Sequence, residues 1–125
     1  MLKKLNELEQ ASACLEPSAN RRKQMTSLAV DYAESFLDKL PAMNTFEPDR
    51  GRSKLLEQAF DEQAVEMGAL LETLDTAVNH DGINPASGGH LGYIPGGGIF
   101  PAALGDFLAD ITNRYSGVSY ASPGA

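Results

Sequence analysis

The sequence has few of the residues that usually mark a redox, metal or nucleophilic site. Its 125 residues include no tryptophan, one cysteine and two histidines. A single cysteine excludes an intramolecular disulfide, so we interpret Cys14 as a free thiol in a reducing compartment and expect a cytoplasmic chain. His80 and His90 have no cysteine or carboxylate at metal-ligand spacing, and no Ser-His-Asp or Cys-His arrangement can be recognised. The sequence therefore gives no reason to expect a metal ion.

Basic residues and long apolar runs are also scarce. Ten Lys and Arg residues stand against 17 Asp and Glu residues, and the formal net charge is -7. A nucleic-acid surface needs cations that neutralise phosphates, so this balance argues against a nucleic-acid partner. The cluster Arg21-Arg22-Lys23 is typical of a solvated helix face. Because no run resembles a secretion signal or a membrane span, we expect no membrane partner either.

Apolar residues recur at spacings of three and four, which predicts helices. The clearest pattern covers residues 18–40, with Ser18 as the N-cap and Pro41 as the stop. Other helices are expected at 1–15, at 62–79, at 101–114 and, as a short piece, at 53–59. No strand pattern of convincing length is present. The predicted fold class is therefore all-α, with three to four helices and a long Gly/Pro loop.

That loop covers residues 81–100 and has no periodicity. Loops of about this length are usually functional or disordered, but this one contains Tyr93, Phe100 and several aliphatic residues that disordered linkers lack. We expect it to be ordered against something. Its glycine run precedes a helix whose first turn suits Pro101. A glycine run at the start of a helix could form an anion site. No cation lies in the loop, so a close approach of backbone to a ligand or another chain is favoured.

The helix expected at 101–114 is apolar on most of its surface. Its charges, Asp106, Asp110 and Arg114, form a single line at four-residue spacing. The two carboxylates could act as an acid–base pair, but an ion pair between Asp110 and Arg114 is favoured. The apolar surface exceeds what a small helical bundle can cover. The chain is therefore expected to be part of something larger or to bury itself in a partner.

The stretch "GGHLGYIPGGGIFPAALGDFLADITNRYSGVSYASPGA" closely resembles the N-terminal region of a known enzyme family. These are the pyridoxal-phosphate-dependent amino-acid decarboxylases of the aromatic-L-amino-acid/tyrosine/glutamate group. The matching order is Gly-Tyr-x-Pro, Phe-Pro-x-x-Leu-Gly-Asp, Asn-Arg-Tyr and Ala-Ser-Pro-Gly-Ala. The segment "RRKQMTSLAVDYAESFLDKLP" is similar to the family's first helix. The resemblance covers residues 17–125 and leaves 1–16 as a variable N-terminal extension.

The resemblance implies a role at a subunit interface and at a substrate pocket. In this family the N-terminal helices wrap across the neighbouring subunit of an obligate homodimer, and a fold-type-I α/β domain follows. Tyr93 and Pro95 match residues that line the substrate pocket. Gly96 stands where animal aromatic decarboxylases have a threonine, so the substrate class stays open. Gly117 and Val118 fall where the family reaches toward the partner subunit's active site.

The same resemblance places the catalytic residues elsewhere. The family's Schiff-base lysine, its ring-stacking histidine and its aspartate partner of the cofactor would all lie beyond residue 125. The five lysines of this sequence lie on charged segments, and none has the surroundings of a nucleophilic lysine. We therefore expect an N-terminal fragment, truncated before the cofactor-binding domain, that neither binds pyridoxal phosphate stably nor decarboxylates an amino acid. The alternative is a non-catalytic helical module that associates with itself.

Overall fold

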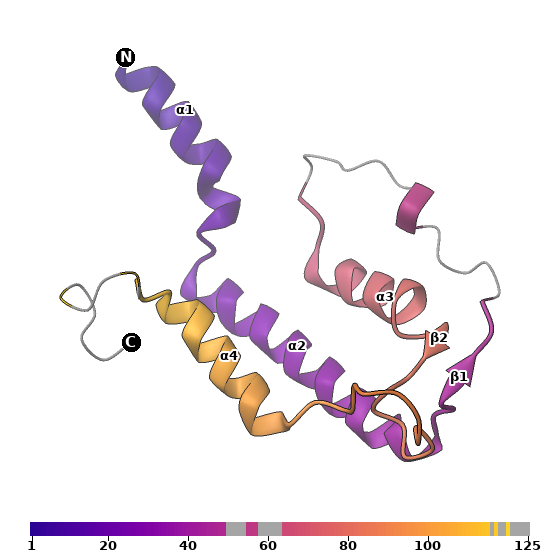
Figure 1. Ribbon diagram of the computed structural model, residues 1–125. Coiled ribbons are helices and arrows are strands. Elements are labelled where there is room, and N and C mark those ends of the chain that lie inside the picture. The colour runs from indigo at the N-terminus through magenta and orange to yellow at the C-terminus, as the bar shows by residue number, and fades with distance from the viewer. Residues whose placement is uncertain (50–54, 58–63, 116, 118–119, 121–125) are drawn as a thin grey trace. The chain divides into compact units, whose positions relative to one another are not determined.

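The computed structural model describes residues 1–49, 55–57, 64–115, 117 and 120, and most of them are helical (Figure 1). The elements are α1 (Leu2–Ser12), α2 (Ala19–Lys39), β1 (Phe46–Glu47), α3 (Met67–Ala77), β2 (Gly82–Ile83) and α4 (Phe100–Thr112), with single 3-10 turns at Ala13–Leu15, Leu40–Ala42 and Leu55–Glu57. The mostly helical fold expected from the periodicity is confirmed. A small two-stranded sheet, which the sequence did not predict, is present as well. The two strands are two residues long, too short to show an alternating pattern. The chain divides into two units, Met1–His90 and Leu91–Ala125.

Helix α2 begins and ends close to where the sequence predicts. The Ser18 hydroxyl accepts a hydrogen bond from the Arg21 N–H at 3.3 Å, which satisfies one of the free donors of the first turn. The helix ends at Lys39, and Pro41 lies inside the 3-10 turn that follows. Proline cannot donate the next helical hydrogen bond, and it disfavours helical geometry in the residue before it.

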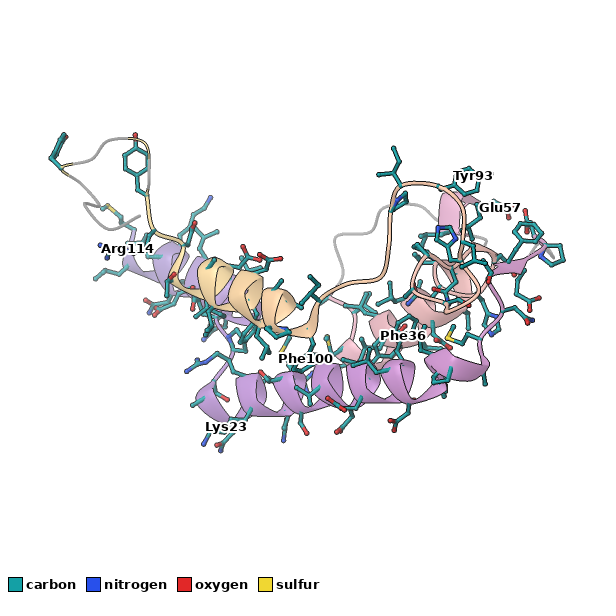
Figure 2. All side chains as sticks on the ribbon, turned by 60° about the horizontal axis from the view of Figure 1, so that its bottom comes forward. Lys23, Phe36, Glu57, Tyr93, Phe100 and Arg114 are labelled. Atoms are coloured by element: carbon teal, nitrogen blue, oxygen red, sulfur yellow. The ribbon has the colours of Figure 1, made fainter. Side chains whose placement is uncertain are left out.

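Helix α3 packs against α2 within the first unit. The Asn79 side-chain amide donates to the Tyr32 hydroxyl at 2.6 Å, and Arg21 forms an ion pair with Glu66. Figure 2 shows Phe36 on the side of α2 that faces α3, whereas Lys23 points away. The helix expected at 62–79 is confirmed over Met67–Ala77. Residues 64–66 and 78–79 lie outside the helix, and residues 62–63 lie outside the described residues. Of the short helix expected at 53–59, a 3-10 turn at Leu55–Glu57 is described, and the remaining positions lie outside the described residues.

Several hydrogen bonds in this unit join residues 43–47 to residues 82–90, and we call this part the strand clamp. Strands β1 and β2 pair antiparallel, with Phe46 opposite Ile83 and Glu47 opposite Gly82. The Asn84 N–H donates to the Thr45 carbonyl at 2.8 Å. The Ser87 hydroxyl donates to the Met43 carbonyl at 3.0 Å, and Ser87 is the one buried residue among those the structure describes. The first half of the long loop is therefore ordered against this segment.

The second unit consists of an extended stretch followed by α4. Ile99 precedes the helix and Pro101 lies in its first turn, as expected. Asn113 has φ 40° and ψ 51°, the left-handed conformation that ends helices, and its N–H donates to the Ala109 carbonyl at 2.8 Å. The helix therefore ends two residues before the expected position, and Arg114 lies off it. The expected helical pair of Asp110 and Arg114 is not formed between these two described residues.

Helix α4 is not covered within its own unit. All of its residues are exposed, including Leu104, Leu108 and Ile111. More generally, none of the apolar side chains in the described ranges is fully buried. The expected burial of this surface in a partner stays a prediction.

Candidate functional site

The three residues expected to line a substrate pocket lie together on the extended stretch before α4. Tyr93 is 83 % exposed, and Pro95 and Gly96 are exposed as well. The backbone of Tyr93 has φ 69°, which is uncommon for a bulky residue. Its ring extends from the outer edge of the loop in Figure 2. A Cβ added to Gly96 would meet no atom within 4 Å. The described residues do not enclose a pocket here, and the role of these three residues stays a prediction.

The two residues expected to reach the partner subunit are described only in part. A side chain at Gly117 would overlap the ring of Tyr115, so the glycine permits this local turn. Val118 lies outside the described residues. Their role at a partner's active site also stays a prediction.

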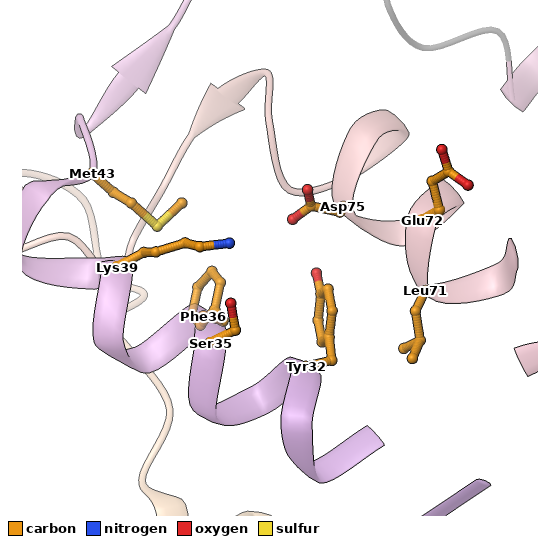
Figure 3. Close-up of a pocket in the computed structure, with 8 residues that line it drawn as sticks. All are labelled: Tyr32, Ser35, Phe36, Lys39, Met43, Leu71, Glu72 and Asp75. Atoms are coloured by element: carbon orange, nitrogen blue, oxygen red, sulfur yellow. The ribbon is translucent and has the colours of Figure 1, made fainter. Parts of the chain in front are cut away.

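The described residues of the first unit form a groove of about 240 Å³ between α2 and α3. Figure 3 shows the residues that line it. They are Tyr32, Ser35, Phe36, Lys39, Met43, Leu71, Glu72 and Asp75. Phe36, Met43 and Leu71 supply an apolar floor, and the remaining side chains bring hydroxyl groups and charges to its rim. We call this hollow the α2–α3 groove.

Charges of opposite sign face each other across the α2–α3 groove. The Lys39 ammonium points from α2 toward the Asp75 carboxylate on α3, and the Tyr32 hydroxyl points into the same gap (Figure 3). Lys39 and Asp75, both described residues, do not form a direct ion pair. The Tyr32 ring is held in place because Asn79 donates to its hydroxyl at 2.6 Å. The lining residues bring one cation, two carboxylates and two hydroxyl groups to this gap.

Sequence reasoning missed the α2–α3 groove. The sequence pattern assigns residues 18–40 to an amphipathic helix and gives no further signal at Tyr32, Phe36 or Lys39. The opposite wall comes from a helix more than 30 positions further along, and residue spacing carries no signal for that pairing. A second hollow is lined by Ala19, Arg22, Lys23, Thr26, Ser27 and Val30. All six belong to α2, so it is a stretch of helix surface rather than a site.

The described residues do not fit pyridoxal phosphate. Lys3, Lys4, Lys23 and Lys39 are all exposed, and a lysine that forms a productive imine needs a desolvated or otherwise activated amine. The glycines at 96 and 98 have open space where a side chain would be, and no cation lies in their loop to hold a phosphate. We derive no step through this cofactor. In the described part of the chain, no three metal-ligating side chains gather, and no helix is both long enough and apolar enough to cross a membrane.

Comparison with known proteins gives no match. No protein-family model fits the chain, and neither a curated protein nor a solved structure is significantly similar to it.

Proposed function

We propose that the chain is the N-terminal dimerisation and substrate-pocket segment of a pyridoxal-phosphate-dependent amino-acid decarboxylase. One structural observation supports this beyond the sequence motifs. The stretch that contains Gly-Tyr-x-Pro and Phe-Pro-x-x-Leu-Gly-Asp has highly exposed apolar side chains, with Leu91 95 % and Ile94 102 % exposed, and α1 exposes Leu2 to 77 % as well. Monomeric proteins rarely expose so much contiguous apolar surface unless another surface covers it. A segment that is completed by a larger domain and a second subunit accounts for this exposure.

In this proposal the chain contributes shape and contact, not the chemistry. In the larger enzyme, the cofactor would serve as the electron sink for the loss of carbon dioxide. Tyr93 and Pro95 would form part of the wall against which the amino-acid substrate is oriented, and the helices would hold two subunits together. A cytoplasmic location belongs to the same proposal.

The pocket assignment is tested in a chain that continues into the α/β domain. We expect Tyr93→Ala and Gly96→Thr each to change kcat/KM at least tenfold for some amino acids, because one methylene in a pocket is worth roughly 10–200-fold. Gly68→Thr is the matched control, since Gly68 on α3 also has open space around its Cα. Unchanged kcat/KM for every substrate in both pocket variants would show that the assignment is wrong.

The 125-residue chain by itself should form no stable cofactor adduct. We expect incubation with pyridoxal phosphate, followed by borohydride reduction and mass mapping, to label several exposed lysines weakly. Stoichiometric labelling of a single lysine, together with release of carbon dioxide from an amino acid, would place the active site in this chain and contradict the proposal.

The exposed surface of α4 also favours a second candidate, a non-catalytic helical module that associates with itself. The two candidates differ in what the gene encodes. An open reading frame that continues past Ala125 into an α/β domain with a lysine-bearing motif supports the decarboxylase, and its absence supports the module.

A further inference from the structure

We propose that the α2–α3 groove binds a small zwitterionic α-amino acid. This binding site is separate from the predicted substrate residues around Tyr93, and it does not depend on the proposed decarboxylase function. The ligand carboxylate lies against Lys39, its ammonium group lies against Asp75, and its side chain covers the apolar floor. Three properties of the groove lead to this assignment.

The first property is size. Pockets that hold drug-sized ligands are roughly 300–1,000 Å³, and the volume of about 240 Å³ here suits something smaller. Its floor of Phe36, Met43 and Leu71 takes an aliphatic or thioether side chain. Methionine adapts its shape readily, so Met43 can follow side chains of different outline.

The second property is the arrangement of charge. Lys39 and Asp75 point toward each other from opposite walls without a direct ion pair between these described residues (Figure 3). A ligand with one positive and one negative group would neutralise both side chains. A simple amine leaves Lys39 without a counter-charge, and a simple carboxylic acid leaves Asp75 without one.

The third property is the orientation of Tyr32. Its hydroxyl oxygen accepts from the Asn79 amide at 2.6 Å, which fixes the ring and leaves the hydroxyl hydrogen able to donate to a ligand carboxylate. Lys39 and Asp75 are both exposed, and exposed charges contribute little each, so a millimolar Kd is expected.

The test compares three probes of one shape by NMR titration of the 125-residue chain. L-leucine carries both charges, 3-methylbutan-1-amine lacks the carboxylate, and 4-methylpentanoic acid lacks the ammonium group. We expect L-leucine to shift the amide signals of Lys39, Met43 and Asp75, and to bind about three to five times more tightly than either singly charged probe. Equal affinities for the three probes, or shifts located away from α2 and α3, would overturn the proposal.

Two variants assign the charges to the ligand groups. Lys39→Met should make L-leucine bind no more tightly than 3-methylbutan-1-amine. Asp75→Asn should make it bind no more tightly than 4-methylpentanoic acid. Lys23→Met and Asp31→Asn, exposed substitutions on α2 outside the groove, are the matched controls and should leave both advantages in place. Helical circular dichroism confirms that each variant is folded. If the controls reduce the advantages as much as the groove variants do, the discrimination reflects net charge and the proposal is wrong.

Discussion

The strand clamp and α4 are stabilised in different ways. The clamp joins segments about 40 positions apart through a strand pair, backbone hydrogen bonds and the buried Ser87 hydroxyl. The bonds that define α4 and its ends all connect residues within a few positions of each other. The clamp contains the one buried side chain of the described residues, whereas α4, the most apolar of the described helices, buries none of its side chains.

This contrast shows that an apolar pattern predicts a face to be buried but not the surface that buries it. Periodicity shows that a helix has a face to bury, but it does not show whether the covering surface belongs to the same chain. In the clamp, by contrast, the small polar residue Ser87 is buried although no apolar pattern in the sequence predicts its burial. The following changes test this difference, from the largest expected effect to the smallest.

Replacing Leu104 and Leu108 together with Gln should weaken self-association of the chain at least a hundredfold. Each leucine contributes roughly 1.5–3 kcal/mol when fully buried, and Gln preserves the helix. Sedimentation velocity over a range of concentrations measures the effect. Asp106→Asn with Asp110→Asn, on the polar line of the same helix, should retain association. A wild-type chain that stays monomeric at high concentration would contradict the prediction.

Gly89→Ala should destabilise the clamp by about 1–3 kcal/mol, because a Cβ there would come within 2.5 Å of the Thr45 hydroxyl oxygen. Amide exchange at Asn84 and chemical denaturation measure the loss. Gly88→Ala is the control, since its Cβ would meet nothing within 4 Å. Adding Thr45→Ala to Gly89→Ala should recover part of the stability. If the double variant is no better than the sum of the two single ones, the overlap is not the cause.

Ser87→Ala should cost about 1–2 kcal/mol, because it leaves the Met43 carbonyl without its donor. Exchange of the His90 amide, which donates to the Ser87 carbonyl at 2.9 Å, should become roughly tenfold faster. Ser27→Ala, on the exposed surface of α2, should leave that rate unchanged. An equal response to both substitutions would mean that the clamp is no more constrained than a helix surface.

Glu66→Gln should have the smallest effect, roughly 0.2–1 kcal/mol, because the side chain of Glu66 is 79 % exposed in its pair with Arg21. In 1 M salt, which screens the ion pair, the variant and the wild type should have the same free energy of unfolding. Glu34→Gln on α2 provides the comparison in the same denaturation experiment. A loss that persists in high salt would point to packing rather than charge.

The sequence predicts the helices because their signals are local. Ser18 and Pro41 mark the two ends of α2, and Pro101 marks the first turn of α4. The end of α4 is missed because Asn113, a residue that tolerates the left-handed conformation, stops the helix before the pattern does. Asparagine near a helix end is a recognised stop signal, so this boundary could have been found.

Neither the clamp nor the α2–α3 groove could be predicted from spacing. Thr45 meets Ser87, and Lys39 faces Asp75, only because the chain folds back on itself. The predicted pocket residues rest on family resemblance alone. The described surroundings of Tyr93, Pro95 and Gly96 show no feature that marks them as a site.

We expect the clamp to close late when the first unit folds. Its Met43–Ser87 contact spans 44 positions, so the chain must close a long loop before that bond can form. Helices need only neighbouring residues, so α2 and α3 should form before the clamp closes. The entropy of closure rises only with the logarithm of loop length, and doubling the intervening segment should cost about 0.6 kcal/mol. Related chains can therefore differ in length between β1 and α3 with little effect on equilibrium stability.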